Sequence, residues 1–249
     1  MTEFAIKVAG QVAAVNALFE SSRDYCRDYL CDEKPGFSVV ITPADIALER
    51  EKSARTDRAE GVPVRNVSDA QLEITAIQRK IAEALFAHNV LLFHGSVVAV
   101  DGVAYLFTAK SGTGKSTHAR LWREFLGDQA VMVNDDKPFL RVTEHGILAC
   151  GSPWNGKHRL GSNICVPLQA ICVLERGEEN HIAEISAEQA LFMLLQQSNR
   201  PEKAALLPKY LELVDAVAAH VAFYRLQCNM EIEAAEVAYK TLSAKLECP

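Results

Sequence analysis

Apolar and polar positions alternate along the chain in patterns that predict both strands and helices. Short apolar runs bounded by turn-forming residues predict strands, and apolar residues recurring every three to four positions predict helices. The predicted strands cover residues 4–8, 37–42, 90–93, 96–100, 103–108, 130–133, 137–142, 146–150 and 170–175. The predicted helices cover about 68–88, 117–126 and 206–220, one that begins after Ser186, and a closing helix marked by Ile232, Ala235, Ala238, Leu242 and Leu246.

The spacing of these elements predicts a mixed α/β fold. Strands 96–100 and 103–108 are joined at Asp101-Gly102, a typical hairpin turn, and further short strands follow closely. So many hairpins argue against a purely parallel, doubly wound sheet, and we expect a mixed β-sheet with packed helices. We expect residues 1–66 to form a small N-terminal α+β segment and residues 67–249 to form the main domain. Residues 49–61 carry charges of both signs and no large apolar side chain, which predicts a solvated, mobile loop or hairpin tip.

Composition and charge narrow the class of protein. The 249 residues are 49% hydrophobic and 23% charged, as in a soluble globular protein. A net charge of −6 gives no reason to expect nucleic-acid binding. No run of apolar residues is long enough for a transmembrane helix, and the N-terminus lacks the basic region of a secretory signal. These features predict a cytoplasmic protein with no membrane partner.

Seven cysteines are scattered without any C-x-x-C pair. An odd number without metal-ligand spacing favours reduced thiols in a cytosolic protein over a disulfide framework or a zinc site. Cys150, Cys165 and Cys172 lie in apolar runs, so we expect them to be small core residues.

The most informative segment is 109–117, Ala-Lys-Ser-Gly-Thr-Gly-Lys-Ser-Thr. It matches the phosphate-binding (Walker A) pattern G-x-x-x-x-G-K-[ST] except at Ala109, where a negative φ would still allow the turn. A predicted strand precedes it and a predicted helix follows it, as this motif requires. Glycines let backbone N–H groups face one anion, and the helix N-terminus and a lysine add positive charge. We therefore predict nucleotide binding by Lys110, Ser111, Gly112, Thr113, Gly114, Lys115, Ser116 and Thr117, with the Ser116 hydroxyl placed to ligand Mg²⁺.

Two further positions carry candidate chemistry. Asp135-Asp136 lies 20 residues after Lys115, where a predicted strand ends. Acids there can hold a metal or accept a proton, although Asn-Asp-Asp is also a common turn former. His94, at the end of strand 90–93, could ligand a metal, contact a γ-phosphate or hydrogen bond to a loop, or simply lie at the edge of the core.

Together, the His-Gly-Ser segment at 94–96, the loop 109–117 and Asp135-Asp136 resemble the HPr kinase/phosphorylase and phosphoenolpyruvate carboxykinase superfamily. The resemblance covers roughly residues 69–176 and makes 67–249 an HPr-kinase-like P-loop catalytic domain. It implies ATP and Mg²⁺ as cofactors, with Lys115 on the transferring phosphate. One of Asp135 and Asp136 would act as base and the other, assigned here to Asp136, would support the metal beside Ser116. His94 would lie next to the γ-phosphate.

The chain departs from this family in two respects. The downstream Glu-x-Arg-Gly-x-Gly signature of HPr kinase/phosphorylases is missing, and at that distance residues 151–159 read Gly-Ser-Pro-Trp-Asn-Gly-Lys-His-Arg. This segment could be a lid that brings Lys157 or Arg159 onto the phosphates, or a surface loop with Trp154 packed beneath it. The chain is also too short for a carboxykinase and has no segment resembling an oxaloacetate site, which disfavours decarboxylation chemistry.

We therefore expect an ATP- and Mg²⁺-dependent kinase that phosphorylates a hydroxyl on a protein serine, a peptide or a small molecule. The alternative is a nucleotide-binding regulatory or scaffold protein with weak or no transfer activity, which Ala109 and the missing signature favour. The resemblance also implies assembly into a homo-oligomer. The acceptor, the choice between ATP and GTP, and any reverse phosphorylase activity are not encoded in these motifs.

Overall fold

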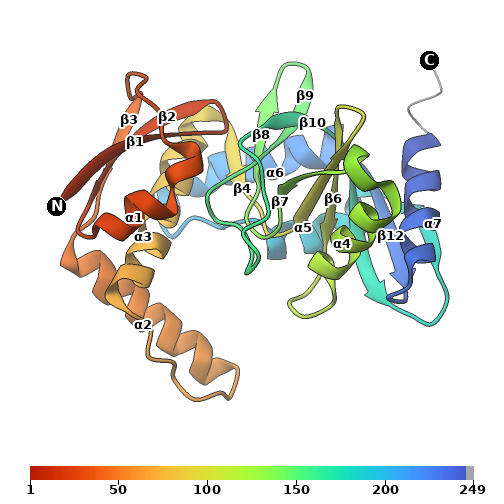
Figure 1. Ribbon diagram of the computed structural model, residues 1–249, viewed down its shortest axis with the longest axis horizontal. Helices are drawn as coiled ribbons and strands as arrows, with labels where there is room; N and C mark the ends of the chain where they lie inside the picture. The colour runs from red at the N-terminus through yellow and green to blue at the C-terminus, as the bar shows by residue number, and fades with distance from the viewer. Residues whose placement is uncertain (245–249) are drawn as a thin grey trace. The chain divides into compact units, whose positions relative to one another are not determined.

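The computed structural model describes residues 1–244, which fall into two compact units (Figure 1). The first unit is Met1–His88 and the second begins at Asn89. This boundary lies 22 residues later than the predicted one at 66/67, because helix α3 (Asp69–Leu85) packs on the strands and helices of the first unit. Leu246 and Cys248 lie outside the described residues. Within residues 1–244, no helix has the length and apolar character needed to span a membrane.

The first unit is a three-stranded sheet with helices packed on it. The strands are β1 (Thr2–Val8), β2 (Gln11–Ala17) and β3 (Phe37–Val40), in the order β1-β2-β3. β1 and β2 are antiparallel, whereas β2 and β3 are parallel. The helices are α1 (Glu20–Tyr25), α2 (Pro43–Ala59) and α3, with a 3₁₀ turn at Arg27–Tyr29. β2 and α1 have no counterpart among the predicted elements.

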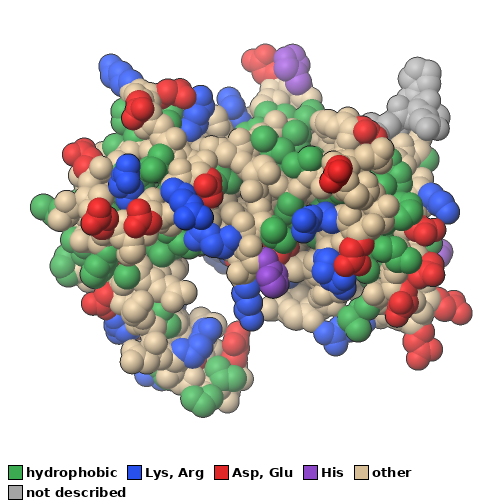
Figure 2. Space-filling model, in the orientation of Figure 1, with side chains coloured by type: hydrophobic (Ala, Val, Ile, Leu, Met, Phe, Trp, Pro, Cys, Tyr) green, Lys and Arg blue, Asp and Glu red, His purple; other side chains and the backbone are tan. Residues whose placement is uncertain are grey.

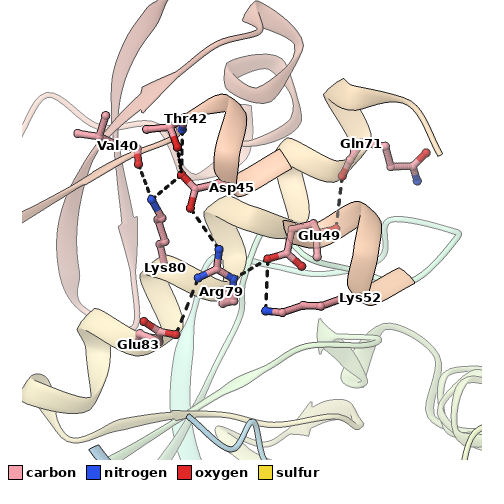
Figure 3. A network of polar contacts seen from close by, with 10 residues as sticks. Val40, Thr42, Asp45, Glu49, Lys52, Gln71, Arg79, Lys80 and Glu83 are labelled. Atoms are coloured by element: carbon pink, nitrogen blue, oxygen red, sulfur yellow. Dashed lines mark hydrogen bonds and ion pairs between the residues drawn. The ribbon is translucent and has the colours of Figure 1, made fainter. Parts of the chain in front are cut away.

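Helix α2 occupies the segment that we expected to be a mobile loop, so that prediction is wrong. Its apolar signal is missing because the helix docks on α3 through ion pairs (Figure 3). Arg79 donates from Nε to Glu49 Oε1 at 2.5 Å, and Lys80 Nζ lies 2.7 Å from Asp45 Oδ2. Glu49 is only 6% exposed. A pattern search based on apolar periodicity does not detect a helix held by charged side chains.

A buried carboxylate on α3 caps the N-terminus of helix α1. Glu73 is fully buried and accepts hydrogen bonds from the backbone N–H groups of Leu18 and Phe19, at 2.5 and 3.0 Å. The hydroxyl of Ser22 also donates to it at 2.5 Å. The N-cap residue of α1, Phe19, has no side-chain acceptor, so Glu73 satisfies these backbone donors from a distant part of the chain.

The second unit is built on a nine-stranded mixed sheet, and the predicted mixed α/β class is confirmed. The main path runs β4-β8-β9-β10-β6-β5-β7, and β12 pairs with both β10 and β11. The strands are β4 (Val90–Leu92), β5 (Ser96–Val100), β6 (Val103–Thr108), β7 (Val131–Asn134), β8 (Phe139–Thr143), β9 (Gly146–Cys150), β10 (Cys165–Arg176), β11 (His181–Ile185) and β12 (Ala222–Cys228). The helices are α4 (Lys115–Leu126), α5 (Ala187–Gln197), α6 (Leu207–His220) and α7 (Ile232–Ser243).

Strand directions bring distant polar segments to one edge of this sheet. β5 is antiparallel to both β6 and β7, so β6 and β7 end at the edge where β5 begins. β10 and β12 run parallel to β6 and end at that same edge. The segment before β5, the loop after β6, the turn after β7 and the last residues of β10 therefore meet. The candidate chemistry lies at this edge.

Helices α4 and α7 cover one face of the sheet and close an apolar core. Trp122 of α4 is fully buried against Tyr105 and Phe107 of β6, with ring centroids 5.1 and 5.0 Å apart. Tyr239 of α7 meets the same indole edge-on at 5.6 Å. This packing fixes α4, and thus the loop that precedes it.

The prediction of seven reduced thiols is wrong for one pair. Cys150 and Cys165 are cross-strand neighbours on β9 and β10 and form a disulfide. Cys150 and Cys172 are buried as expected, whereas Cys165 is exposed. Strand pairing decides which cysteines meet, and it cannot be deduced from their spacing in the sequence. The disulfide also removes the argument for a cytosolic location that rested on reduced thiols.

Candidate functional site

The loop 109–117 joins β6 to α4, in the strand–loop–helix arrangement that the sequence predicted. Gly112 and Gly114 have φ values of 77° and 125°, which are strained for any residue with a side chain. Gly114 is the N-cap of α4 and has no side-chain acceptor, so backbone N–H groups at this helix start are left for a ligand. Lys110, Ser111 and Ser116 are exposed at the loop surface, and Thr113 and Thr117 are half-buried.

Lys115 lies back against its own loop. Its Nζ donates to the carbonyl oxygen of Ala109 at 3.2 Å, and the residue is only 9% exposed. Burial lowers the pKa of this ammonium group, Lys137 adds to that effect, and Asp136 and Asp135 oppose it. Ala109 is fully buried and keeps a negative φ, so the departure from glycine is accommodated. Lys115 thus holds a poorly solvated charge that an anion would stabilise.

The two acids that follow β7 have different surroundings. Asp135 is 7% exposed, and its Oδ1 accepts a hydrogen bond of 2.8 Å from the Ser96 hydroxyl. Asp136 is more exposed, and its Oδ1 lies 3.4 Å from His94 Nε2 and 3.5 Å from Lys137 Nζ. Lys137 did not emerge from the motif search. Its only sequence signal was its position directly after the acid pair.

Asn134 organises the turn that carries these acids. Its Oδ1 accepts from the backbone N–H groups of Asp136 and Lys137 at 2.9 and 2.7 Å. Its Nδ2 donates to Ser152 and to Asn155 Oδ1, the latter at 2.7 Å. The Asn-Asp-Asp segment is therefore a turn and a site for two carboxylates at once, so the two sequence interpretations are compatible.

His94 is held between three elements. Its backbone N–H donates to the carbonyl of Gln197 at 2.8 Å, and its own carbonyl accepts from the Thr108 hydroxyl at 3.0 Å. Burial lowers the pKa of its imidazole to about 4, with Lys137 and Lys115 acting in the same direction and Asp136 against it. At neutral pH the ring is uncharged, so it can donate or accept a hydrogen bond but supplies no charge.

Of the two roles that the sequence left open for the segment 151–159, the structure shows the packed Trp154, and a contact of Lys157 or Arg159 with phosphates stays a prediction. Trp154 is buried, with its ring edge-on to Phe139 at 6.2 Å, so the first part of the segment is anchored. Gly156 lies against Asp135, because a Cβ there would meet the Oδ2 atom at 3.1 Å. Lys157, His158 and Arg159 are exposed beyond this anchor. The segment returns along the edge strand, where Ser162 N donates to the Val133 carbonyl at 3.1 Å.

Arg176, at the end of β10, also reaches the glycine-rich loop. Its Nη2 donates to the Gly112 carbonyl at 2.5 Å, and its Nε lies 3.5 Å from the Thr113 carbonyl oxygen. The parallel pairing of β10 with β6 brings this residue to a loop more than sixty positions earlier. No local pattern could reveal that contact.

Two cavities flank the loop 109–117. The first, of about 510 Å³, lies on the β10 and β12 side and is mostly apolar, with Leu121, Leu174 and Met230 among its lining residues. The second, of about 520 Å³, lies on the β7 side and includes Ser116 and Asp135. The loop therefore separates an apolar cavity from one that contains a candidate metal ligand and a candidate base.

The available donors are suitable for Mg²⁺ bound together with phosphates. Within residues 1–244 no cluster of three His, Cys, Asp or Glu side chains could hold a metal without other ligands. Ser116 and the two aspartates offer oxygen atoms, which Mg²⁺ prefers, and Mg²⁺ commonly takes one or two protein ligands plus phosphates and water. These residues fit a metal that arrives with a nucleotide.

The fold and site define a mixed α/β protein with a glycine-rich loop between a strand and a helix. Residues 62–233 match the family described as SynChlorMet cassette protein ScmC, and the chain belongs to that family. Among solved structures, the chain is similar to the HPr(Ser) kinase/phosphatase from Coxiella burnetii, at 13% sequence identity and a TM-score of 0.39. That similarity covers 63% of this chain and 99% of the other. No curated protein matches the chain.

Proposed function

We propose that this protein is an ATP- and Mg²⁺-dependent phosphotransferase that transfers the γ-phosphate of ATP to a hydroxyl group. The observation that carries the proposal is the convergence of Lys115, His94, Lys137 and two aspartates beside the glycine-rich loop, at one edge of the sheet. Phosphoryl transfer requires positioning and charge stabilisation more than covalent chemistry, and such a cluster supplies both.

Residue roles follow from the surroundings of each group. Lys115 and Lys137 neutralise the transferring phosphate, and neutral His94 donates a hydrogen bond to it. Ser116 and Asp136 would hold Mg²⁺, which would supply further positive charge to the phosphates. Asp136 is assigned to the metal because it is the more exposed of the two acids, whereas Asp135 is buried and accepts a hydrogen bond from Ser96.

Asp135 is the proposed base, because it lines the cavity from which an acceptor can approach. The acceptor oxygen forms a bond to the γ-phosphorus while the bond between that phosphorus and the β–γ bridging oxygen breaks. ADP leaves with the bridging oxygen, and the hydroxyl proton passes to the Asp135 carboxylate. Ser96 holds the other carboxylate oxygen and orients the group.

The nucleoside is assigned to the first cavity. Its lining by Leu121, Leu174 and Met230 suits the faces of a flat, uncharged base. That cavity lies on the opposite side of the loop from Asp135, so a nucleotide bound there leaves the β7 side open to the acceptor.

Nucleotide binding is tested first, by thermal denaturation with ATP, ADP, GTP and pyrophosphate, each with and without Mg²⁺. A ligand that binds only the native state raises the midpoint by mass action. We expect an ATP shift that needs Mg²⁺ and disappears in Lys115→Ala. No shift with any of the four compounds would refute the proposal.

Transfer is tested by slow ADP release with water as the acceptor. Asp135→Asn keeps the shape of the carboxylate and removes its basicity, so we expect nucleotide binding to persist while ADP release falls at least tenfold, within the usual range for a general base. Asp128→Asn, an exposed acid after α4, is the matched control. Nucleotide binding together with ADP release equal in both variants would favour the regulatory alternative.

A further inference from the structure

The second cavity, beside the proposed transfer site, is lined by more basic than acidic side chains. Its volume is about 520 Å³, and Asp135 is the only acid among its lining residues. Figure 2 shows Lys or Arg side chains next to Asp or Glu side chains over the region where Figure 1 places α4. The cavity is lined by Ser116, Thr117, Ala119, Arg120, Arg123, Met132, Asp135, His158 and Leu160.

Helix geometry places one serine and two arginines of α4 in a row along the cavity. Ser116, Arg120 and Arg123 are spaced i, i+4 and i+7 on α4, so they share one face of the helix. At 1.5 Å per residue, Arg123 lies about 10 Å further along the axis than Ser116. The opposite face carries Leu121 and Trp122, which are buried in the core, so the row is fixed in its orientation.

The two arginines differ in whether an acidic side chain of the protein already neutralises their charge. Arg120 forms an ion pair with Glu124 on the same helix. Arg123 has no ion pair or side-chain hydrogen bond to any of residues 1–244, although it lines the cavity. His158 also lines the cavity, and its ring offers a further hydrogen-bond donor. This end of the cavity therefore suits an anion, and a guanidinium suits a carboxylate, which it can bind through two parallel hydrogen bonds.

The stretch between the two ends is apolar. Ala119 is 1% exposed and Met132 is 8% exposed, and both line the cavity together with Leu160. A ligand that spans the cavity would therefore have a polar group near Ser116 and Asp135, an aliphatic middle and an anionic end at Arg123.

We propose that this cavity binds the phosphate acceptor, and that the acceptor carries a carboxylate about 10 Å from the hydroxyl that is phosphorylated. This inference rests on the proposed function, and it defines the substrate class. Arg123 is the residue that selects for the carboxylate, with Arg120 in support. A peptide with an acidic residue three positions from its serine has this spacing, because an extended chain rises about 3.3 Å per residue. A hydroxy acid with a long aliphatic chain offers the same two groups.

Binding measured by calorimetry tests the proposal, on full-length protein saturated with Mg²⁺ and a non-hydrolysable ATP analogue. One arm compares acetyl-Ser-Ala-Ala-Glu-amide with its Gln counterpart, which differs only in charge. The other arm compares 8-hydroxyoctanoate with 1,8-octanediol. We expect the acidic member of at least one pair to bind about tenfold more tightly than its neutral counterpart, the effect of one good charge-assisted contact. The arm that shows the preference identifies the source of the acceptor.

Variants tie the preference to the cavity. Arg123→Gln should abolish the tenfold preference, and Lys240→Gln, which removes an equal charge from exposed α7 outside the cavity, should preserve it. The proposal is overturned if neither acidic member is preferred, or if Arg123→Gln keeps the preference. Binding of the acidic ligand only when the ATP analogue is left out would also overturn it, because the cavity would then belong to the nucleotide.

The two proposals can fail separately. If no nucleotide binds, the proposed function fails, and the carboxylate preference can still be measured in nucleotide-free protein and compared with Arg123→Gln. If Mg²⁺ and ATP bind and ADP is released but no carboxylate preference exists, the proposed function stands and the substrate class is wrong.

Discussion

Acidification should destabilise the second unit through two histidines that are neutral in the folded state, half-buried His94 and buried His118. His94 lies at the candidate site, and His118 lies under α4, where it is 2% exposed and accepts a hydrogen bond from Trp122 Nε1 at 3.1 Å. Burial is the largest cause that lowers each pKa from 6.5 to about 4. Because the folded pKa is depressed, each group favours the native state fully above pH 6.5, and that contribution is lost as the pH falls towards 4.

The size of the effect follows from linkage. A pKa that falls from 6.5 in the unfolded chain to about 4 in the folded protein contributes about 3 kcal/mol to the free energy of unfolding, and all of it is lost well below pH 4. By pH 5 each histidine has already lost about 2 kcal/mol of that contribution. The two groups together should lower the free energy of unfolding by about 4 kcal/mol between pH 7.5 and pH 5. Asp45, in the first unit, has its pKa lowered to about 2, so its contribution persists above pH 4 and does not mask the effect.

Urea denaturation followed by tryptophan fluorescence measures this unit alone, since Trp122 and Trp154, the two tryptophans of the chain, both lie in it. In His118→Gln the loss of stability between pH 7.5 and pH 5 should fall to about half, because only His94 still takes up a proton. His145→Gln, at an exposed turn, should retain the full loss. An unchanged pH dependence in His118→Gln would refute the assignment of a buried, neutral imidazole.

Three further changes test the packing. Glu73→Ala should destabilise the first unit by about 3 kcal/mol, because it leaves buried donors unpaired, and loss of circular dichroism on heating measures this. Arg79→Met should cost about 3 kcal/mol in the same assay by leaving Glu49 buried without its guanidinium, whereas an unchanged midpoint would contradict the importance of the ion pair. Reduction of the Cys150–Cys165 disulfide, or Cys165→Ser, should lower the unfolding free energy of the second unit by up to about 3 kcal/mol, and equal urea midpoints with and without reductant would contradict it.

Local sequence patterns predicted the elements that carry their own signals. Helix α3 begins after Ser68, whose hydroxyl accepts from Gln71 N, and the Asp101-Gly102 hairpin joins β5 to β6 with positive φ at both residues. Strand β12 was missed, and it lies at 222–228 directly after α6, where its apolar residues continue the pattern of the helix. Helix α2 was missed because it packs on α3 through charged contacts and therefore lacks the apolar stripe that predicts a helix.

The sequence by itself determined the glycine-rich loop, since strand, glycines, Lys115 and helix follow one another within a few residues and their backbone requirements are local. It also determined that His94 lies between two apolar strands and that Asp135-Asp136 follows another. Tertiary structure decided that these groups meet, because the antiparallel order of β7, β5 and β6 places their ends at one edge. It alone decided the contact of Arg176 with Gly112 and the Cys150–Cys165 pair. The physical reason is that strand pairing joins residues far apart in sequence, and its register depends on the whole core rather than on any segment.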